Sequence, residues 1–177
     1  MLAATGRSEP GGASARCRAI LGHSRFAYDA GVTSPDPHDV AAARLGGADQ
    51  RYTRSRRALI EVLVAADAPL TVDEIVERDP ALALSTAYRN LVVFESCGAV
   101  HRIVTADEHA RYELDEALTE RHHHHLVCSG CGVVLDFTVP DPLERELDRA
   151  LGDVASSFGF AAEHHRLDLV GRCAACG

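Results

Sequence analysis

The sequence predicts an α+β fold in which an N-terminal winged helix-turn-helix domain is followed by a small α/β domain. Three observations lead to this prediction. Residues 53–114 contain three helix-like segments followed by a two-stranded ribbon, and residues 122–177 combine short strand-like segments with one amphipathic helix. In addition, four consecutive histidines and two Cys-x-x-Cys pairs lie in the second part, which indicates that this part binds metal.

The three helices are predicted from apolar periodicity and from signals at their ends. Apolar residues recur at three- and four-residue spacing over residues 53–66. The sequence Thr-Val-Asp-Glu at 71–74 has the form of a capping box, which would start the second helix. The third helix is expected over residues 82–97, with Ser85 as its N-cap and Gly98 as its stop.

Two alternating segments, 100–104 and 110–114, then predict a pair of strands, which completes a winged helix. In this architecture the third helix enters the DNA major groove. The net charge of −8 argues against a nucleic-acid partner, but arginines are concentrated near the first helix, and a local basic patch outweighs a global sum. The predicted DNA-contacting residues are Arg51, Arg54, Arg56 and Arg57 near the first helix and Ser85, Thr86, Tyr88 and Arg89 on the third.

The four paired cysteines near the end of the chain are predicted to bind one zinc ion. Cys128 and Cys131 form one Cys-x-x-Cys pair, and Cys173 and Cys176 form the other. Each pair can hold one side of a tetrahedral Zn²⁺. The alternatives are two disulfides or four unrelated core cysteines.

The four histidines at 122–125 are predicted to serve two separate sites. In an extended segment alternate residues face opposite sides. His122 and His124 would therefore point one way, while His123 and His125 would point the other.

The remaining organisation follows from composition. Residues 1–47 are rich in Gly, Ala, Ser and Pro and are expected to be a disordered tail, followed by the DNA-binding domain at 48–114 and a polar hinge at 115–121. The metal-binding domain at 122–177 has too little core to be stable alone, so pairing with a second copy is expected. The chain lacks an apolar run long enough to span a membrane and a secretory signal, which favours a soluble, cytoplasmic protein.

Two sequence segments carry a resemblance to a known family. The first is Ser-Thr-Ala-Tyr-Arg-Asn-Leu at 85–91, and the second is His-His-His-His-Leu-Val-Cys-Ser-Gly-Cys at 122–131, followed by the terminal Cys-x-x-Cys. Over roughly residues 50–177 the chain resembles the ferric uptake regulator family. The resemblance implies a homodimeric repressor with a winged helix, an α/β dimerisation domain, a structural zinc, and a regulatory metal that sets the protein for an inverted-repeat DNA operator.

The resemblance also implies which residues bind metal. The four cysteines match the structural zinc ligands. A sensing site at the hinge comprises His123, His125 and Glu113, and His101 is assigned to it because some zinc sensors supply an aspartate at that place. A second site within the dimerisation domain comprises His122, His124, Glu144 and His165. Asp136 matches an acidic position that helps to bind the metal in peroxide-sensing members.

Two departures from the family pattern bear on the sensed metal. Many iron- and peroxide-sensing members place a histidine just before the second helix, where this chain has Pro69. Zinc sensors often have a cysteine soon after the wing, where this chain has Asp115. The regulatory ion is accordingly left open between Fe²⁺, Zn²⁺ and Mn²⁺, since histidine and carboxylate ligands suit all three.

The predicted function is that of a metal-responsive, DNA-binding transcriptional repressor, not an enzyme. A peroxide sensor of the same family is the first alternative. A zinc hydrolase is a remote one, because the sequence has no His-Glu-x-x-His helix and two Cys pairs leave no open coordination position. A metal-buffering protein would leave the winged helix without a purpose.

Overall fold

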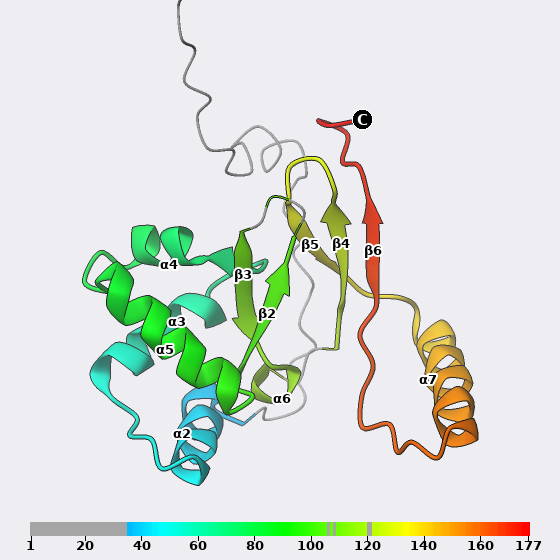
Figure 1. The fold of residues 1–177 in the computed structure, drawn as a ribbon, viewed down its shortest axis with the longest axis horizontal. Helices are drawn as coiled ribbons and strands as arrows, with labels where there is room; N and C mark the ends of the chain where they lie inside the picture. The colour runs from blue at the N-terminus through cyan, green and yellow to red at the C-terminus, as the bar shows by residue number, and fades with distance from the viewer. Residues whose placement is uncertain (1–34, 106, 108, 120–121) are drawn as a thin grey trace, which may run out of the picture.

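The computed structural model describes residues 35–105, 107, 109–119 and 122–177. The N-terminal half consists of helices packed on a small antiparallel sheet with strand order β1-β3-β2 (Figure 1). Its elements, in chain order, are α2 (Pro37–Gly47), α3 (Arg54–Val64), β1 (Leu70–Thr71), α4 (Val72–Arg78), α5 (Leu84–Ser96), β2 (Val100–Val104), β3 (Ala110–Leu114) and α6 (Glu116–Thr119).

The three predicted helices and the two strands of the wing are present. The capping box at the start of α4 is confirmed, because the Thr71 hydroxyl accepts from the Glu74 N–H while the Glu74 carboxylate accepts from the Thr71 N–H. Ser85 is not the N-cap of α5. That helix begins one residue earlier, and its N-cap, Ala83, makes no side-chain bond. Leu91 and Phe94 anchor α5 in a core that also includes Leu59 of α3.

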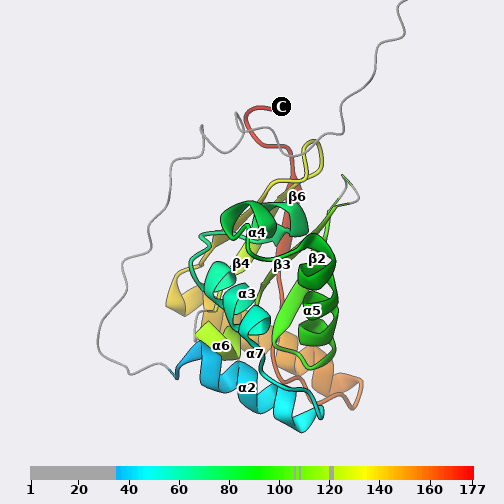
Figure 2. The same ribbon diagram turned by 90° about the vertical axis from the view of Figure 1, so that its left-hand side faces the viewer.

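The disordered tail predicted for residues 1–47 is wrong for its last part, because residues 37–47 form helix α2. Asp36 caps this helix, and Ala41 and Leu45 are fully buried in the same core as α3 and α5. Viewed from the helical side, α2 lies at the opposite end of this half from α4 (Figure 2). Residues 1–34 lie outside the described part of the chain. This helix was not predicted because its sequence is mostly alanine, glycine and polar residues. Such a sequence shows little of the three- and four-residue apolar periodicity by which helices are recognised.

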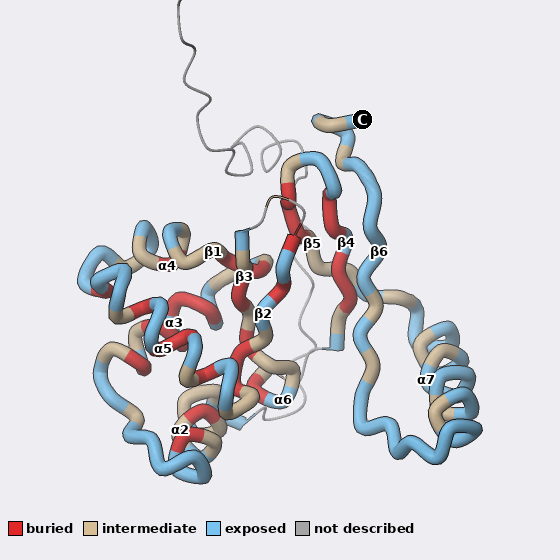
Figure 3. The backbone as a smooth tube through the Cα atoms, viewed as in Figure 1, coloured by how far each residue is buried: buried red, intermediate tan, exposed pale blue. Residues whose placement is uncertain are grey.

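The C-terminal half is a three-stranded sheet with one long helix beside it. Strand β4 (His124–Cys128) lies at the centre, antiparallel to β5 (Val134–Phe137) and parallel to β6 (Asp168–Gly171). The alternating sequence at 165–170 predicts a last strand that begins at residue 165, but the strand begins at residue 168. Helix α7 (Asp141–Ser157) has no buried residue, and β6 is exposed along its whole length (Figure 3).

The two halves contact each other along the wing. Ile103 of β2 forms a small buried cluster with Val127 of β4 and Val134 of β5. The end of β3 points its Glu113 side chain at the histidines that begin β4. Among the described residues, no helix is both long enough and apolar enough to cross a membrane.

Candidate metal centres and DNA-binding surface

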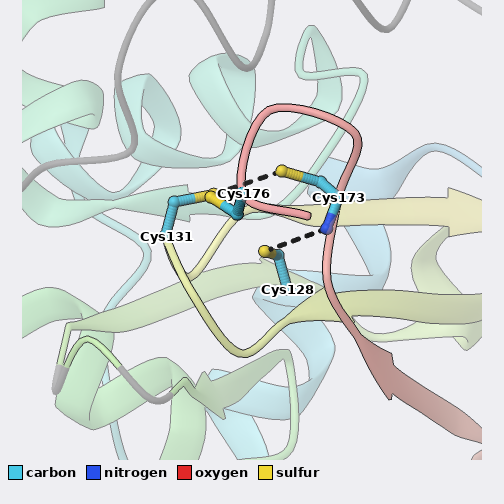
Figure 4. Close-up of side chains that lie close together, drawn as sticks. All are labelled: Cys128, Cys131, Cys173 and Cys176. Atoms are coloured by element: carbon cyan, nitrogen blue, oxygen red, sulfur yellow. Dashed lines mark hydrogen bonds between the residues drawn. The ribbon is translucent and has the colours of Figure 1, made fainter.

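The four paired cysteines converge at the end of the C-terminal sheet (Figure 4). Cys128 ends β4, Cys131 lies in the turn that follows, and Cys173 and Cys176 lie beyond β6. Their sulfur atoms all lie within 4.8 Å of one another. The Cys131 and Cys173 Sγ atoms are 3.8 Å apart, and none of the four cysteines is in a disulfide bond, so the disulfide alternative does not describe this structure.

The local backbone favours the thiolate form that binds metal. The Cys128 sulfur accepts N–H groups from Gly130 at 3.4 Å and from Cys173 at 3.3 Å. Burial acts to raise the pKa of the Cys128 thiol, but these backbone hydrogen bonds lower it to about 6. Four cysteines, with no fifth ligand group in the cluster among the described residues, match the closed, tetrahedral donor set that is typical of structural zinc.

A second cluster joins the wing to the C-terminal sheet. Glu113 at the end of β3, His123 and His125 before and within β4, and Asp136 of β5 each offer a ligand atom within 4.8 Å of the others. Glu113 Oε2 lies 3.1 Å from His123 Nε2 and 3.0 Å from His125 Nε2. Burial acts to raise the pKa of Glu113, but the two histidine hydrogen bonds dominate and lower it to about 2. The carboxylate is therefore ionised and aimed at the two imidazoles.

The fourth member of this cluster is Asp136, whereas His101, which was predicted as a ligand, is not among its members. His101 Nε2 lies 2.7 Å from Asp115 Oδ2, and Asp115 is in turn paired with Arg44 of α2 at 2.7 Å. The assignment of His101 as a ligand is therefore not supported, because its ring is turned toward Asp115. Asp136 has a buried Oδ1 atom without a hydrogen-bond partner, and burial raises the pKa of its carboxyl to about 6. Such an unpaired buried oxygen is well suited to a cation.

The third cluster lies within the C-terminal half and surrounds one carboxylate. Glu144, in the first turn of α7, has oxygens 3.0 Å from Nε2 atoms of His122, His124 and His165. The four ligand atoms lie within 4.8 Å of one another. Glu116 of α6 also contacts His122 at 2.8 Å, and Asp148 of α7 contacts His165 at 3.1 Å. These outer carboxylates orient two of the rings, as partners of metal-binding histidines commonly do.

The histidine run divides between these two clusters by alternation. The rings of His123 and His125 lie edge to face at 5.1 Å on the side of Glu113, and those of His122 and His124 do so at 4.9 Å on the side of Glu144. One extended segment thus supplies two imidazoles to each of two separate donor sets.

The predicted DNA-contacting residues are mostly exposed, with one exception. Arg51, Arg54 and Arg57 are exposed near α3, and so are Ser85, Tyr88 and Arg89 on α5, whereas Thr86 is half-buried. Arg56 is only 8% exposed. Its guanidinium donates to Asn90 Oδ1 at 3.3 Å, Arg51 O at 2.6 Å and Gln50 Oε1 at 2.8 Å. This burial does not support the predicted DNA contact of Arg56, and the residue instead holds α3, α5 and the segment before α3 together.

The comparison with protein families decides the identity of this architecture. Residues 47–170 match the model of the ferric uptake regulator family. The chain is a member of the ferric uptake regulator family. It is a metal-dependent, DNA-binding transcriptional repressor of that family.

Individual relatives of this family member have related roles. It is 32% identical over 130 residues to the peroxide operon regulator of Bacillus subtilis, covering 71% of this chain and 83% of the relative. It is 29% identical to the peroxide-responsive repressor PerR of Staphylococcus epidermidis, covering 76% and 86%. Among solved structures, the Vibrio cholerae ferric uptake regulator aligns with a TM-score of 0.56 at 28% identity, covering 74% of this chain and 98% of that one.

Three features that shape these sites were not predicted from the sequence. The Arg44 contact with Asp115 belongs to helix α2, which was not predicted. The burial of Arg56 could have been suspected, because in a helix it lies three residues before the apolar Leu59 and four before Ile60. Asp136 was noted only as a family position, although its place in a strand beside the histidine strand brings it into the cluster.

Proposed function

We propose that this regulator acts in the cytoplasm as a homodimer that binds an inverted-repeat operator when a divalent metal occupies the Glu113 cluster. The observation that carries the proposal is that this cluster takes Glu113 from the wing and its other ligands from the C-terminal half. A metal bound there would tie the DNA-binding domain to the dimerisation domain. A ligand that favours one arrangement of two domains shifts the population toward it.

The dimer is supported by apolar surface that one chain leaves uncovered. Large hydrophobic side chains are exposed on α7, on β6 and in the segment between them, and α7 buries none of its residues in the single chain. These residues are Leu143, Leu151, Val154, Phe158, Phe160, Leu169 and Val170. Large apolar side chains that gather at exposed positions in one half of a protein are typical of an interface with a partner. A second copy would cover it, and two-fold pairing would present two α5 helices to successive major grooves.

The DNA contact is assigned to α5 and the exposed arginines. Tyr88 and Arg89 lie on the outer face of α5, where Tyr88 is 56% exposed. Arg51, Arg54 and Arg57 can contact phosphates beside it, since phosphate contacts position a protein and base contacts specify the sequence. The Cys128 cluster would hold a structural zinc, and the Glu144 cluster would tune the response from within the dimerisation domain.

A decisive experiment measures DNA binding against metal. Operator fragments are selected from random DNA in the presence of Mn²⁺, and binding is then titrated at buffered free Fe²⁺, Mn²⁺ and Zn²⁺. We expect binding that depends on metal in the parent protein and is lost in Glu113→Ala. Asp39→Ala, which removes an exposed carboxylate from α2, outside the metal clusters and the proposed DNA contacts, is the matched control and should respond normally. DNA binding by the parent protein that does not change with metal concentration would overturn the proposal.

A peroxide-sensing role is the second candidate, and Asp136 favours it. This residue lies in the Glu113 cluster, and its family position is associated with peroxide-sensing members. The test is to expose the Fe²⁺-loaded protein to hydrogen peroxide. Addition of one oxygen atom to His123 or His125, seen by peptide mass analysis together with loss of DNA binding, would establish this role. Unmodified histidines with retained DNA binding would exclude it.

A further inference from the structure

The β2–β3 hairpin contacts the C-terminal half at a second place, away from the Glu113 cluster. Near the tip of the hairpin, the Asp107 carboxylate lies close to Gly132, in the turn that follows Cys131, on the side where a side chain of residue 132 would project. Gly132 has a φ of +68°, and a Cβ atom there would overlap the carboxylate. Gly132 also donates its N–H to the Cys128 carbonyl at 2.9 Å, so this contact touches the cysteine turn itself.

Asp107 is held rigidly on the hairpin. Its Oδ2 atom pairs with Arg111 Nη2 at 2.8 Å, and the Asp107 and Arg111 side chains are only 9% and 3% exposed. It also accepts a hydrogen bond from the Thr105 hydroxyl and one from the His109 N–H at 3.2 Å. Although burial acts to raise the pKa of Asp107, the hydrogen bonds from Arg111 and Thr105 hold that pKa well below its usual range. A desolvated, fully bonded ion pair has a fixed geometry, which a surface pair lacks.

Apolar packing connects this contact with the metal cluster. Ile103, which is cross-strand from Arg111, is 5% exposed and packs against Val127 and Val134. The hairpin therefore meets the C-terminal half at three places. Glu113 makes the contact at one end of the hairpin, Asp107 makes the contact at the other, and the apolar cluster lies between them.

We infer that Asp107 is a positioning residue for the metal response, because it latches the wing onto the cysteine turn. The inference rests on the proposed function and deepens it. The latch, defined as Asp107, Arg111 and Gly132, contains no ligand of the Glu113 cluster. It stabilises the docked wing independently of the regulatory metal. A metal that bridges Glu113 to the histidines binds the docked arrangement, so its apparent affinity scales with the fraction of molecules that are docked.

The latch also gives the cysteine turn a role beyond the C-terminal half. The turn bearing Cys128 and Cys131 is the surface against which the wing docks. A well-ordered turn therefore sets the sensitivity of a metal cluster that shares no ligand with it. Two sites are coupled when both favour the same arrangement of one mobile element, here the wing.

The test compares Asp107→Asn, Gly132→Ala and the parent protein with two readouts that need no DNA. The first is Mn²⁺ affinity, measured in competition with a chelator. The second is hydrogen exchange at the amides of Ile103, Arg111 and Tyr112. We expect both variants to bind Mn²⁺ about fivefold or more weakly, the lower end of typical coupling between sites. We also expect faster exchange in the hairpin, unchanged zinc content, and DNA binding that recovers at saturating Mn²⁺.

The two variants disturb the latch from opposite sides. Gly132→Ala alters no charge, so weaker Mn²⁺ binding in this variant cannot come from a changed electrostatic field. Val104→Thr is the matched control, because Val104 lies on the same hairpin and is 62% exposed. It should match the parent in both readouts.

Parental Mn²⁺ affinity and parental exchange in a variant that keeps its zinc would overturn the inference, and so would failure of DNA binding to recover at saturating Mn²⁺. If one variant fails to fold, the other decides by the same criteria. A parent protein that binds Mn²⁺ but shows no metal-dependent DNA binding would contradict the proposed function instead. The affinity and exchange measurements on the latch would still give their own answer.

Discussion

The two halves of the molecule differ in how they are stabilised. In the N-terminal half, one continuous cluster of buried side chains runs from Ala41 of α2 through Phe94 of α5 to Leu118 of α6. In the C-terminal half, few apolar residues are buried and α7 buries none. Thiols, imidazoles and carboxylates instead come together in this half, in three clusters that could bind metal. The first half has an apolar core of its own, whereas we expect the second to need bound metal and a covering partner to become equally stable.

The largest expected effect on the stability of the C-terminal half comes from a substitution of one of the four clustered cysteines. Cys131→Ser should lose the structural zinc and, with it, the dimer, because structural zinc sites contribute roughly 10–16 kcal/mol to the folding of small domains. Zinc content and sedimentation of the purified protein would measure this. Cys97→Ser is the control, since Cys97 lies at the end of α5, outside the cysteine cluster. A Cys131→Ser protein that remained a dimer with full zinc would contradict the assignment.

Two phenylalanines sharpen the contrast between the halves. Phe94→Ala should lower the free energy of unfolding by about 3–5 kcal/mol, because it leaves a cavity among fully buried neighbours. Phe158→Ala, at a side chain that is 85% exposed in the single chain, should change that energy by about 0.5 kcal/mol or less under monomeric conditions. It should instead weaken self-association, measured by the concentration dependence of sedimentation. Equal destabilisation of the monomer by both changes would refute the contrast.

The histidine run should fail in two distinct ways. His123→Ala is expected to weaken metal-dependent operator binding by about 100-fold or more while zinc and dimer persist, because it breaks the cluster that joins the two halves. His122→Ala is expected to shift the metal response by about tenfold or less, since its cluster lies within the C-terminal half. Operator titrations at controlled metal concentration decide between them. Equal losses of operator binding in the two variants would mean that all four histidines belong to one site. No loss in either variant would mean that the histidines have no part in the metal response.

The smallest effects are expected at the arginines around α3. Arg54→Ala should remove one phosphate contact and reduce the slope of log affinity against log salt by about 0.9. Arg56→Ala should leave that slope unchanged. It should lower the free energy of unfolding by about 1–3 kcal/mol, because the groups that accept hydrogen bonds from Arg56 would lose their donor. Salt titrations of DNA binding and thermal unfolding separate the two. A reduced salt slope in Arg56→Ala would restore it to the DNA-contacting set.

The predictions that matched the structure are those that depend on neighbouring residues in the sequence. The Thr71–Glu74 capping box, the alternation of the wing strands and the grouping of the four cysteines all follow from short-range geometry. The division of His122–His125 also follows from geometry, because a strand reverses the side-chain direction at every residue.

The parts that could not be predicted depend on contacts between distant segments. Helix α2 has few apolar residues, and only the packing of Ala41 and Leu45 against the rest of the core shows why it is stable. His101 looked like a ligand until Arg44, from that same unpredicted helix, was seen to hold Asp115 beside it. Arg56 looked like a phosphate contact because periodicity does not report which polar side chain turns inward to bond Asn90.

The run of identical residues at the start of β4 also makes the two histidine clusters less sensitive to a shift in strand register. A slip by one residue exchanges the two faces of a strand, which normally places the wrong side chains at every position. Here the four places now occupied by His122–His125 would still hold three imidazoles after a slip in either direction, because Arg121 or Leu126 would enter at only one end. Single-residue insertions or deletions near this segment could therefore arise during evolution without stripping either donor set of all its histidines. Such tolerance would allow the hinge before β4 to vary in length among descendants of this gene while the metal chemistry persists.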